Sequence, residues 1–327
     1  LYYYTLLAKQ DFTAAEANAN TYISSADPSP ENLYFRGQTE FVQKKYPEAI
    51  TTAKNILSQT NNNPRPRVYR LLAYSYLGAK DTAAACQSTN DYFSKVKEED
   101  MRGEDYLLHA YACGKGNPDM IRNDIFKAVK MDSVLGRQVS LLNEAAKEAK
   151  ANGQRLLEAE LNLMSYNLRG PEKSSPSELI NIAVSYFFGA AYQKADSSAL
   201  AYATLAPDSI YGHYWSALAR ERIDTSMAEG LAMSSYQKTL DVATTDKVRY
   251  KSQGVRAATS LAIYSFNIKN DKAAAIAFAD KGLEFDPANA NLINVKNVAT
   301  AKPPAPAAKP ATPKKTNSSA SNAKPKT

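Results

Sequence analysis

The chain has 327 residues, of which 44% are hydrophobic and only 13 are glycine. This composition supplies ample apolar surface for a core and favours helices over β-structure. The net charge of +7 is concentrated at one end, because six basic residues and no acidic residue follow Thr300. These six residues are Lys302, Lys309, Lys314, Lys315, Lys324 and Lys326.

Without that segment, the body of the chain keeps 34 of its 40 basic residues against 33 acidic ones. A nearly neutral body lacks the basic surface that a phosphate backbone requires, so we expect no nucleic-acid binding by the folded body. The sequence contains no apolar run long enough for a membrane-spanning helix, and we expect no transmembrane segment. Because the sequence begins at Leu1 rather than methionine, we expect a processed or trimmed chain. Membrane anchoring through a missing N-terminus stays open.

Three helix pairs are predicted in the first 99 residues, over 1–27, 30–63 and 66–99. Small and apolar residues recur in each pair at helical spacing, and the first helix of the first pair is clipped. The recurring positions are Phe12, Ala15, Ala19 and Tyr22; Leu33, Gly37, Phe41, Tyr46, Ala49, Ala53 and Ile56; and Tyr69, Leu72, Ala73, Tyr76, Ala85 and Tyr92.

Five further pairs follow, over 102–133, 135–168, 176–207, 209–242 and 248–289. The pairs at 102–133 and 135–168 match the pattern weakly, and the pair at 209–242 carries extra loop residues around 225–229. The pattern is clearest in residues 176–207, where Pro207 ends the second helix. Its positions are Leu179, Ile182, Ala183 and Tyr186, then Tyr192, Ala195, Ala199 and Tyr202.

This order of aromatic, small and apolar positions resembles the tetratricopeptide repeat, a helix-turn-helix unit of about 34 residues. The resemblance covers residues 1–298 and includes the phrase KGLEFDPAN at 281–289. It implies an all-α, right-handed superhelix, an α-solenoid of about eight repeats. Small residues let helices approach closely, and stacking buries the apolar stripe of each pair. An irregular helical bundle is the alternative. Residues 299–327, rich in Lys, Pro and Ala, are predicted to be disordered.

No constellation of residues predicts an enzyme, a metal site or a cofactor. The histidines His109 and His213 and the cysteines Cys86 and Cys113 lack the spacing of metal ligands. His109 and Cys113 share a helix face at i and i+4, but nothing in the sequence orients a base, and a packing role is favoured. By the repeat register, Cys86 begins the second helix of one unit and Cys113 ends the first helix of the next. A disulfide between them is sterically allowed, and two separate buried thiols are the alternative.

In this family the first helices of successive repeats line a concave groove that holds peptides or protein segments. The resemblance therefore implies a partner-binding set of aromatic and guanidinium groups, the types that dominate interface hot spots. Several of the tyrosines could instead pack between helices. The implied residues are Tyr34 in the second repeat, Arg67, Arg70 and Tyr74 in the third, Phe187 and Phe188 in the sixth, Tyr211 and Tyr214 in the seventh, and Tyr264 in the eighth.

The sequence thus predicts a non-enzymatic interaction scaffold whose partner is a protein or peptide. Its Tyr-rich repeats and Lys/Pro/Ala tail look like those of exported tetratricopeptide proteins of gram-negative bacteria, which favours a periplasmic or outer-membrane-associated location and a role in an envelope assembly. A cytosolic co-chaperone or adaptor is the alternative. A further alternative is that the chain is the repeat part of a larger protein whose upstream domain carries the activity.

Overall fold

The computed structural model describes residues 2–26 and 29–301, and within these ranges the chain contains helices and no β-strand. The all-α prediction is therefore confirmed. The chain divides into two compact units, Leu1–Asp246 and Lys247–Thr327. Most of the predicted tail, residues 302–327, lies outside the described residues, as do residues 27 and 28 at the predicted end of the first repeat.

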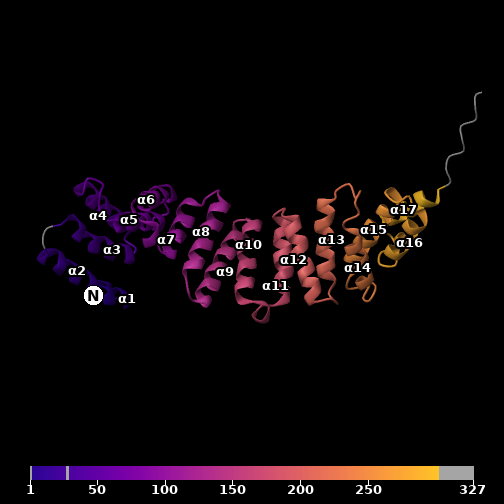
Figure 1. Ribbon diagram of the computed structural model, residues 1–327, viewed down its shortest axis with the longest axis horizontal. Helices are drawn as coiled ribbons and strands as arrows, with labels where there is room; N and C mark the ends of the chain where they lie inside the picture. The colour runs from indigo at the N-terminus through magenta and orange to yellow at the C-terminus, as the bar shows by residue number, and fades with distance from the viewer. Residues whose placement is uncertain (1, 27–28, 302–327) are drawn as a thin grey trace, which may run out of the picture. The chain divides into compact units, whose positions relative to one another are not determined.

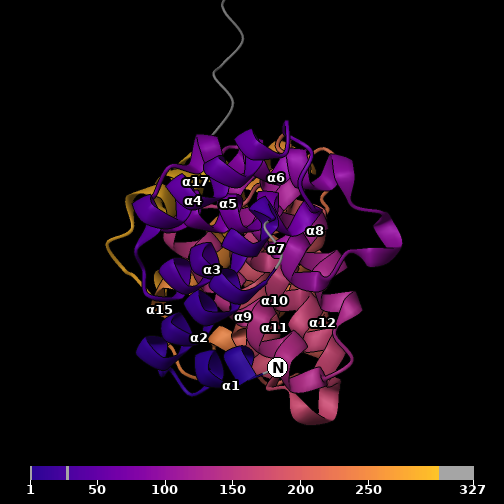
Figure 2. The ribbon, with the colours of Figure 1, turned by 90° about the vertical axis from the view of Figure 1, so that its left-hand side faces the viewer.

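The first unit consists of helix pairs that follow one another along the chain (Figure 1). Viewed from the N-terminal side, the early pairs of this unit lie in front of α9 to α12 (Figure 2), so successive pairs stack. Three short 3₁₀ segments, η1 (Pro30–Leu33), η2 (Glu98–Asp100) and η3 (Pro171–Lys173), precede α3, α7 and α11. The pairs are α1 (Tyr2–Ala8) with α2 (Phe12–Ser25), α3 (Tyr34–Val42) with α4 (Tyr46–Gln59), α5 (Pro66–Gly78) with α6 (Thr82–Lys95), α7 (Gly103–Cys113) with α8 (Pro118–Met131), α9 (Leu135–Ala151) with α10 (Arg155–Arg169), α11 (Pro176–Phe188) with α12 (Tyr192–Leu205), and α13 (Ile210–Ile223) with α14 (Met233–Ala243).

The second unit contains one more pair, α15 (Lys251–Asn267) and α16 (Lys272–Leu283), followed by α17 (Ala290–Thr300). Leu292 of α17 is fully buried and packs in a small core with Ala262 and Ala279 of the preceding pair. The helix continues to Thr300, two residues beyond the predicted end of the folded region at residue 298. An additional helix thus covers the apolar stripe of the last pair.

One turn geometry joins the two helices of seven of the described pairs. A single residue takes a positive φ, and the next residue is the N-cap of the second helix. In the turn at Lys80, the N–H of the N-cap Asp81 donates to the carbonyl of Tyr76 at 2.9 Å, and the Asp81 carboxylate accepts from the N–H of Ala84 at 3.1 Å. This closes the first helix and caps the second within a few residues. The residues with positive φ are Gln10, Lys44, Lys80, Gly116, Gly153, Ala190 and Asn270.

Small residues set the distance between neighbouring helices. Ala53, Ala73 and Ala183 have no exposed surface. At Gly212 of α13, an added Cβ would lie 2.7 Å from the Cβ of Ala203 and 2.9 Å from the carbonyl oxygen of Ala199, both on α12. Any larger residue at position 212 would push these helices apart, so the small residues of the repeat pattern fix the stacking.

The connection between α13 and α14 is longer than the others, as the extra loop residues predict. Asp224, which is 9% exposed, organises it. Its carboxylate accepts the backbone N–H of Gly230 at 2.8 Å and that of Leu231 at 3.3 Å. The insertion is therefore an ordered loop held by one buried carboxylate.

Candidate functional site

The nine residues predicted to bind a partner all belong to the first helices of their pairs, α3, α5, α11, α13 and α15. Within the first unit they fall into two groups, one on α3 and α5 and the other on α11 and α13. Tyr264 lies on α15 in the second unit, with the Nζ of Lys269 5.6 Å from its ring centroid. Within the first unit the structure therefore brings the predicted residues together in two groups rather than as one continuous site.

In the group on α3 and α5, Arg67 stacks on Tyr34. The guanidinium carbon lies 4.3 Å from the centroid of the ring, and Nη2 lies 3.9 Å from a carboxylate oxygen of Glu31. The same carboxylate pairs with Arg65, at 3.1 Å from its Nε, and accepts its backbone N–H at 2.8 Å. Burial raises the pKa of Tyr34, so its hydroxyl stays protonated at neutral pH.

Arg70 faces a buried carboxylate rather than open solvent. Its Nη1 lies 3.2 Å from Asp105 of α7, which has no exposed surface. The Tyr92 hydroxyl donates to Asp105 at 3.0 Å, and the backbone N–H of Arg102 donates at 2.9 Å. Burial lowers the pKa of Arg70, but Asp105 and Tyr92 outweigh this effect and raise it. The cation is therefore held in an internal network, and much of its charge is neutralised before any partner arrives.

Tyr74 completes this group. Its hydroxyl donates to the backbone carbonyl of Glu104 at 3.2 Å, and burial raises its pKa to about 12. Tyr34, Arg70 and Tyr74 line a shallow pocket of about 260 Å³ together with Gln38, whose buried Oε1 accepts no hydrogen bond from the residues that the structure describes. The pocket has room for a side chain, and Gln38 offers it a hydrogen-bond acceptor.

In the second group, four aromatic rings of α11 and α13 form what we call the aromatic cluster: Phe187, Phe188, Tyr214 and Trp215. The ring centroids of Phe187 and Phe188 lie 5.4 and 6.1 Å from that of Trp215, and the Tyr214 centroid lies 6.1 Å from it. Phe188 is 64% exposed, which is unusual for a phenylalanine, whereas Phe187 is half-buried and packs against the core.

Tyr211 extends the aromatic cluster by one helical turn. It precedes Tyr214 and Trp215 by three and four residues on α13, so the three share one side of the helix, and it is 40% exposed. The sequence prediction missed Trp215, because this residue does not stand at a groove position of the tetratricopeptide repeat. It could have been found because it is the only tryptophan of the chain, and tryptophan is enriched at interface hot spots.

The cysteines and His109 have structural partners. Cys86 of α6 and Cys113 at the end of α7 form a disulfide, with Cα atoms 4.8 Å apart. The sulfur of Cys113 is therefore no nucleophile in this structure. His109 Nδ1 lies 2.6 Å from Asp124 of α8, and its ring packs on Phe93 with centroids 5.0 Å apart. The described residues contain no group of three His, Cys, Asp or Glu side chains that could hold a metal ion.

No helix within residues 2–26 and 29–301 is both long and apolar enough to cross a membrane.

In comparisons with known proteins, no protein-family model and no curated protein sequence matches the chain.

Solved structures of similar fold are repeat proteins. One is the C-terminal part of a TPR repeat-containing protein from Cytophaga hutchinsonii, with 23% identity and a TM-score of 0.44, covering 80% of this chain and 98% of that one. Another is the TPR2AB domain in the pHSP90 complex of yeast Sti1, with 16% identity and a TM-score of 0.34, covering 83% and 98%. A third is the APC/C hetero-tetramer Cut9-Hcn1, with 14% identity and a TM-score of 0.34, covering 90% and 60%. Within its two units, the chain's own helix pairs, recurring turn and small-residue contacts define the fold as one of tetratricopeptide-type repeats.

Proposed function

We propose that the chain is a non-enzymatic scaffold that binds a peptide or protein segment on its first helices, with the aromatic cluster as the main anchor. The observation that carries this proposal is that Phe188, which contacts Trp215, is 64% exposed, and that Tyr211, one helical turn before Trp215, is 40% exposed. Exposed aromatic rings held by neighbouring rings can bury large apolar area on binding at a small cost in side-chain entropy. A pocket of about 220 Å³, lined by Phe188, Leu156 and Pro118, offers space for a side chain of the partner.

The group around Arg70 is the weaker anchor in this proposal. Its guanidinium already pairs with Asp105, so a partner carboxylate would compete with an internal, buried one. Arg67 remains a planar surface stacked on Tyr34, which suits contact with a flat or apolar group better than capture of a charge. Binding of a segment by apolar and aromatic contacts is therefore favoured over recognition of a terminal carboxylate.

We further propose that the scaffold works in a bacterial cell envelope, in the periplasm or at the outer membrane. The disulfide between Cys86 and Cys113 supports this location, because such bonds persist in oxidising compartments and are rare in the cytosol. Thiol labelling of protein taken from its native cells without reduction tests it. Two labelled cysteines would favour the cytosolic adaptor instead.

The binding proposal is tested with a random peptide library displayed on phage and selected against the folded chain. Phe188→Ala should weaken binding of the selected peptides by about 1–4 kcal/mol, the range of interface hot spots. Leu205→Ala is the matched control, because Leu205 of the second helix α12 is likewise an exposed apolar residue, with 50% of its surface exposed. If Leu205→Ala abolishes binding and Phe188→Ala does not, the partner uses the second helices and the proposal is wrong.

A further inference from the structure

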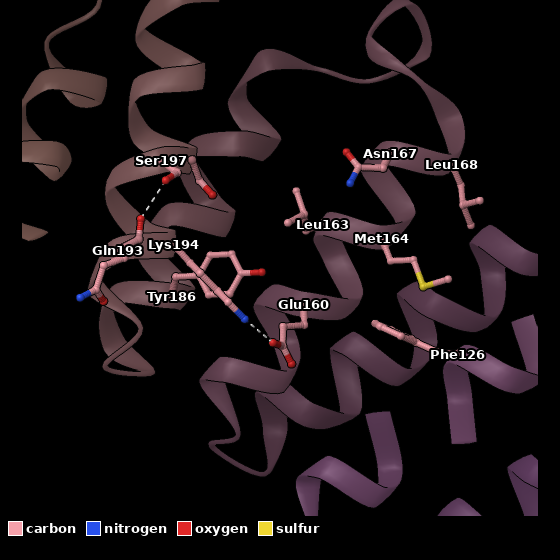
Figure 3. Close-up of a pocket in the computed structure, with 11 residues that line it drawn as sticks. Phe126, Glu160, Leu163, Met164, Asn167, Leu168, Tyr186, Gln193, Lys194 and Ser197 are labelled. Carbon is pink, nitrogen blue, oxygen red and sulfur yellow. Dashed lines mark hydrogen bonds and ion pairs between the residues drawn. The ribbon is translucent and has the colours of Figure 1, made fainter. Parts of the chain in front are cut away.

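A second site lies away from the aromatic cluster, in a cavity of about 720 Å³ between the second helices α8, α10 and α12 (Figure 3). We call it the second-helix cavity. Phe126 of α8 and Leu163, Met164 and Leu168 of α10 supply its apolar wall. Tyr186 of α11 and Lys194 of α12 stand on the opposite side in Figure 3. The volume falls within the range of about 300–1,000 Å³ that is typical of small-molecule sites.

Two largely buried residues present their hydroxyl groups to this cavity. Tyr186 is 2% exposed and Ser198 is 7% exposed. No hydrogen bond joins either hydroxyl to a residue that the structure describes, and neither oxygen is closed off from solvent, so both can pair with water or with a ligand in the cavity. In Figure 3 the Tyr186 hydroxyl points into the space toward Leu163. Burial raises the pKa of Tyr186 to about 12, so the hydroxyl is a donor as well as an acceptor at neutral pH.

The charges around the cavity are balanced among themselves. Glu160 pairs with Lys194 Nζ at 2.7 Å and with Arg122 Nη1 at 3.2 Å. Arg122 also pairs with Asp119 at 3.0 Å. Two cations and two carboxylates thus neutralise one another, and no surplus charge is left to attract a charged ligand.

From this arrangement we infer that the second-helix cavity binds a small neutral amphiphile, a molecule with an apolar body and one hydroxyl, carbonyl or amide group. The body would contact Phe126, Leu163 and Met164, and the polar group would meet the hydroxyls of Tyr186 and Ser198. The observations behind this site are separate from those behind the proposed peptide site, and neither proposal needs the other.

The test is a fluorescence titration with N-phenyl-1-naphthylamine, a neutral probe with an aromatic body and one N–H group. We expect saturable binding of one molecule per chain. Tyr186→Phe removes only the hydroxyl and should weaken binding by about 2- to 12-fold, as the loss of one neutral hydrogen bond does. Leu163→Trp should fill the cavity and abolish binding, and Met164→Phe serves as a second filling variant if Leu163→Trp fails to fold.

Two controls separate this site from other apolar surface. Leu205→Trp makes the same exchange on α12 at an exposed residue outside the cavity, and Phe188→Ala changes the aromatic cluster. Both should bind the probe as the unaltered chain does, while circular dichroism verifies that each variant keeps its helices. Lack of saturable binding, equal binding by a folded cavity-filling variant, or unchanged affinity in Tyr186→Phe would each overturn the inference.

Discussion

Asp105 is a buried residue that gives the neighbouring side chains a structural role. It has no exposed surface and takes hydrogen bonds from Arg70, Tyr92 and the backbone of Arg102. Arg70, predicted from the sequence as a binding residue, thereby also holds α5 to α7. Loss of binding in an Arg70 variant would report on stability as much as on contact with a partner.

We therefore expect Arg70→Met to lower the free energy of unfolding by about 1.5–3 kcal/mol, the contribution of a hydrogen bond to a charged group. Arg67→Met is the matched control, since Arg67 has the same 30% side-chain exposure but contacts the rings of Tyr34 and Phe35 and makes a long ion pair. It should cost about 1 kcal/mol or less. Urea denaturation measures both values, and equal losses in the two variants would contradict the special role of Asp105.

The adjacent residues Phe187 and Phe188 should respond differently to truncation. Phe187→Ala is expected to destabilise the fold by about 2–4 kcal/mol, because the half-buried ring packs on Tyr192, Trp215 and the core. Phe188→Ala should cost less than about 1 kcal/mol, since the ring is mostly in solvent. Thermal unfolding followed by circular dichroism distinguishes them. A Phe188→Ala variant as unstable as Phe187→Ala would mean that Phe188 is a core residue and unsuitable as an anchor.

Among the elements, the turns within the helix pairs carry a recurring conformational cost. Ala190 has a φ of +57° and Lys80 one of +64°, a region that residues with a Cβ rarely adopt. Gly116 and Gly153 occupy the same place in other pairs without that cost. The chain thus tolerates strain at several turns, and packing of the helix pairs must offset it.

Ala190→Gly should consequently raise the free energy of unfolding by about 0.5–1 kcal/mol, because glycine relieves the left-handed strain although it also adds entropy to the unfolded chain. Asn270→Gly should gain less, since asparagine tolerates this conformation better. Chemical denaturation of the two variants checks the order. A destabilised Ala190→Gly variant would show that the turn is not strained.

The start of α11 is sensitive to pH through Glu178. Hydrogen bonds from Arg169 lower its pKa below the ordinary value of 4.5, and the backbone N–H of Ser175 contributes at 2.9 Å. A carboxyl with a lowered pKa binds fewer protons folded than unfolded, so its stabilising effect is complete above about pH 4.5 and fades as the pH falls through the folded pKa.

For this reason, the stability difference between the unaltered chain and Glu178→Gln should be largest near pH 6 and shrink toward pH 3. Glu172→Gln provides the control, because Glu172 is exposed and makes no ion pair among the described residues. Denaturation curves across this pH range give the difference directly. A difference that is constant with pH would exclude an ionic contribution from Glu178.

At the scale of the whole molecule, the surplus charge resides in the lysines after Thr300. Deleting residues 302–327 should abolish retention on heparin at low salt, because the body is nearly neutral. The same deletion should leave the unfolding temperature unchanged to within about 1 °C, since the deleted sequence has no apolar stripe with which to join a core. A truncated chain that still binds heparin would place a basic surface on the folded body, and a loss of several degrees would show that the segment packs on it.

The sequence predicts the helix pairs well, because periodicity and small residues such as Ala73 and Ala183 are local signals of packing. It does not reveal the partner of Arg70, since Asp105 lies 35 residues away and its burial depends on stacking. The second-helix cavity was also missed. Phe126 and Leu163, which line it, come from the two pairs that match the repeat pattern most weakly. A gap between helices also cannot be recognised from the spacing of apolar residues within a single helix.

Tyr186 and Phe187 are consecutive residues of α11, one lining the second-helix cavity and the other belonging to the aromatic cluster. A ligand that displaces the ring of Tyr186 would act on the same turn of α11 that carries Phe187. Such coupling obeys thermodynamic reciprocity: the factor by which an occupied cavity changes the affinity for a peptide equals the factor by which the peptide changes the affinity for the amphiphile. A scaffold coupled in this way would hold its protein partner with a strength set by the concentration of a small molecule.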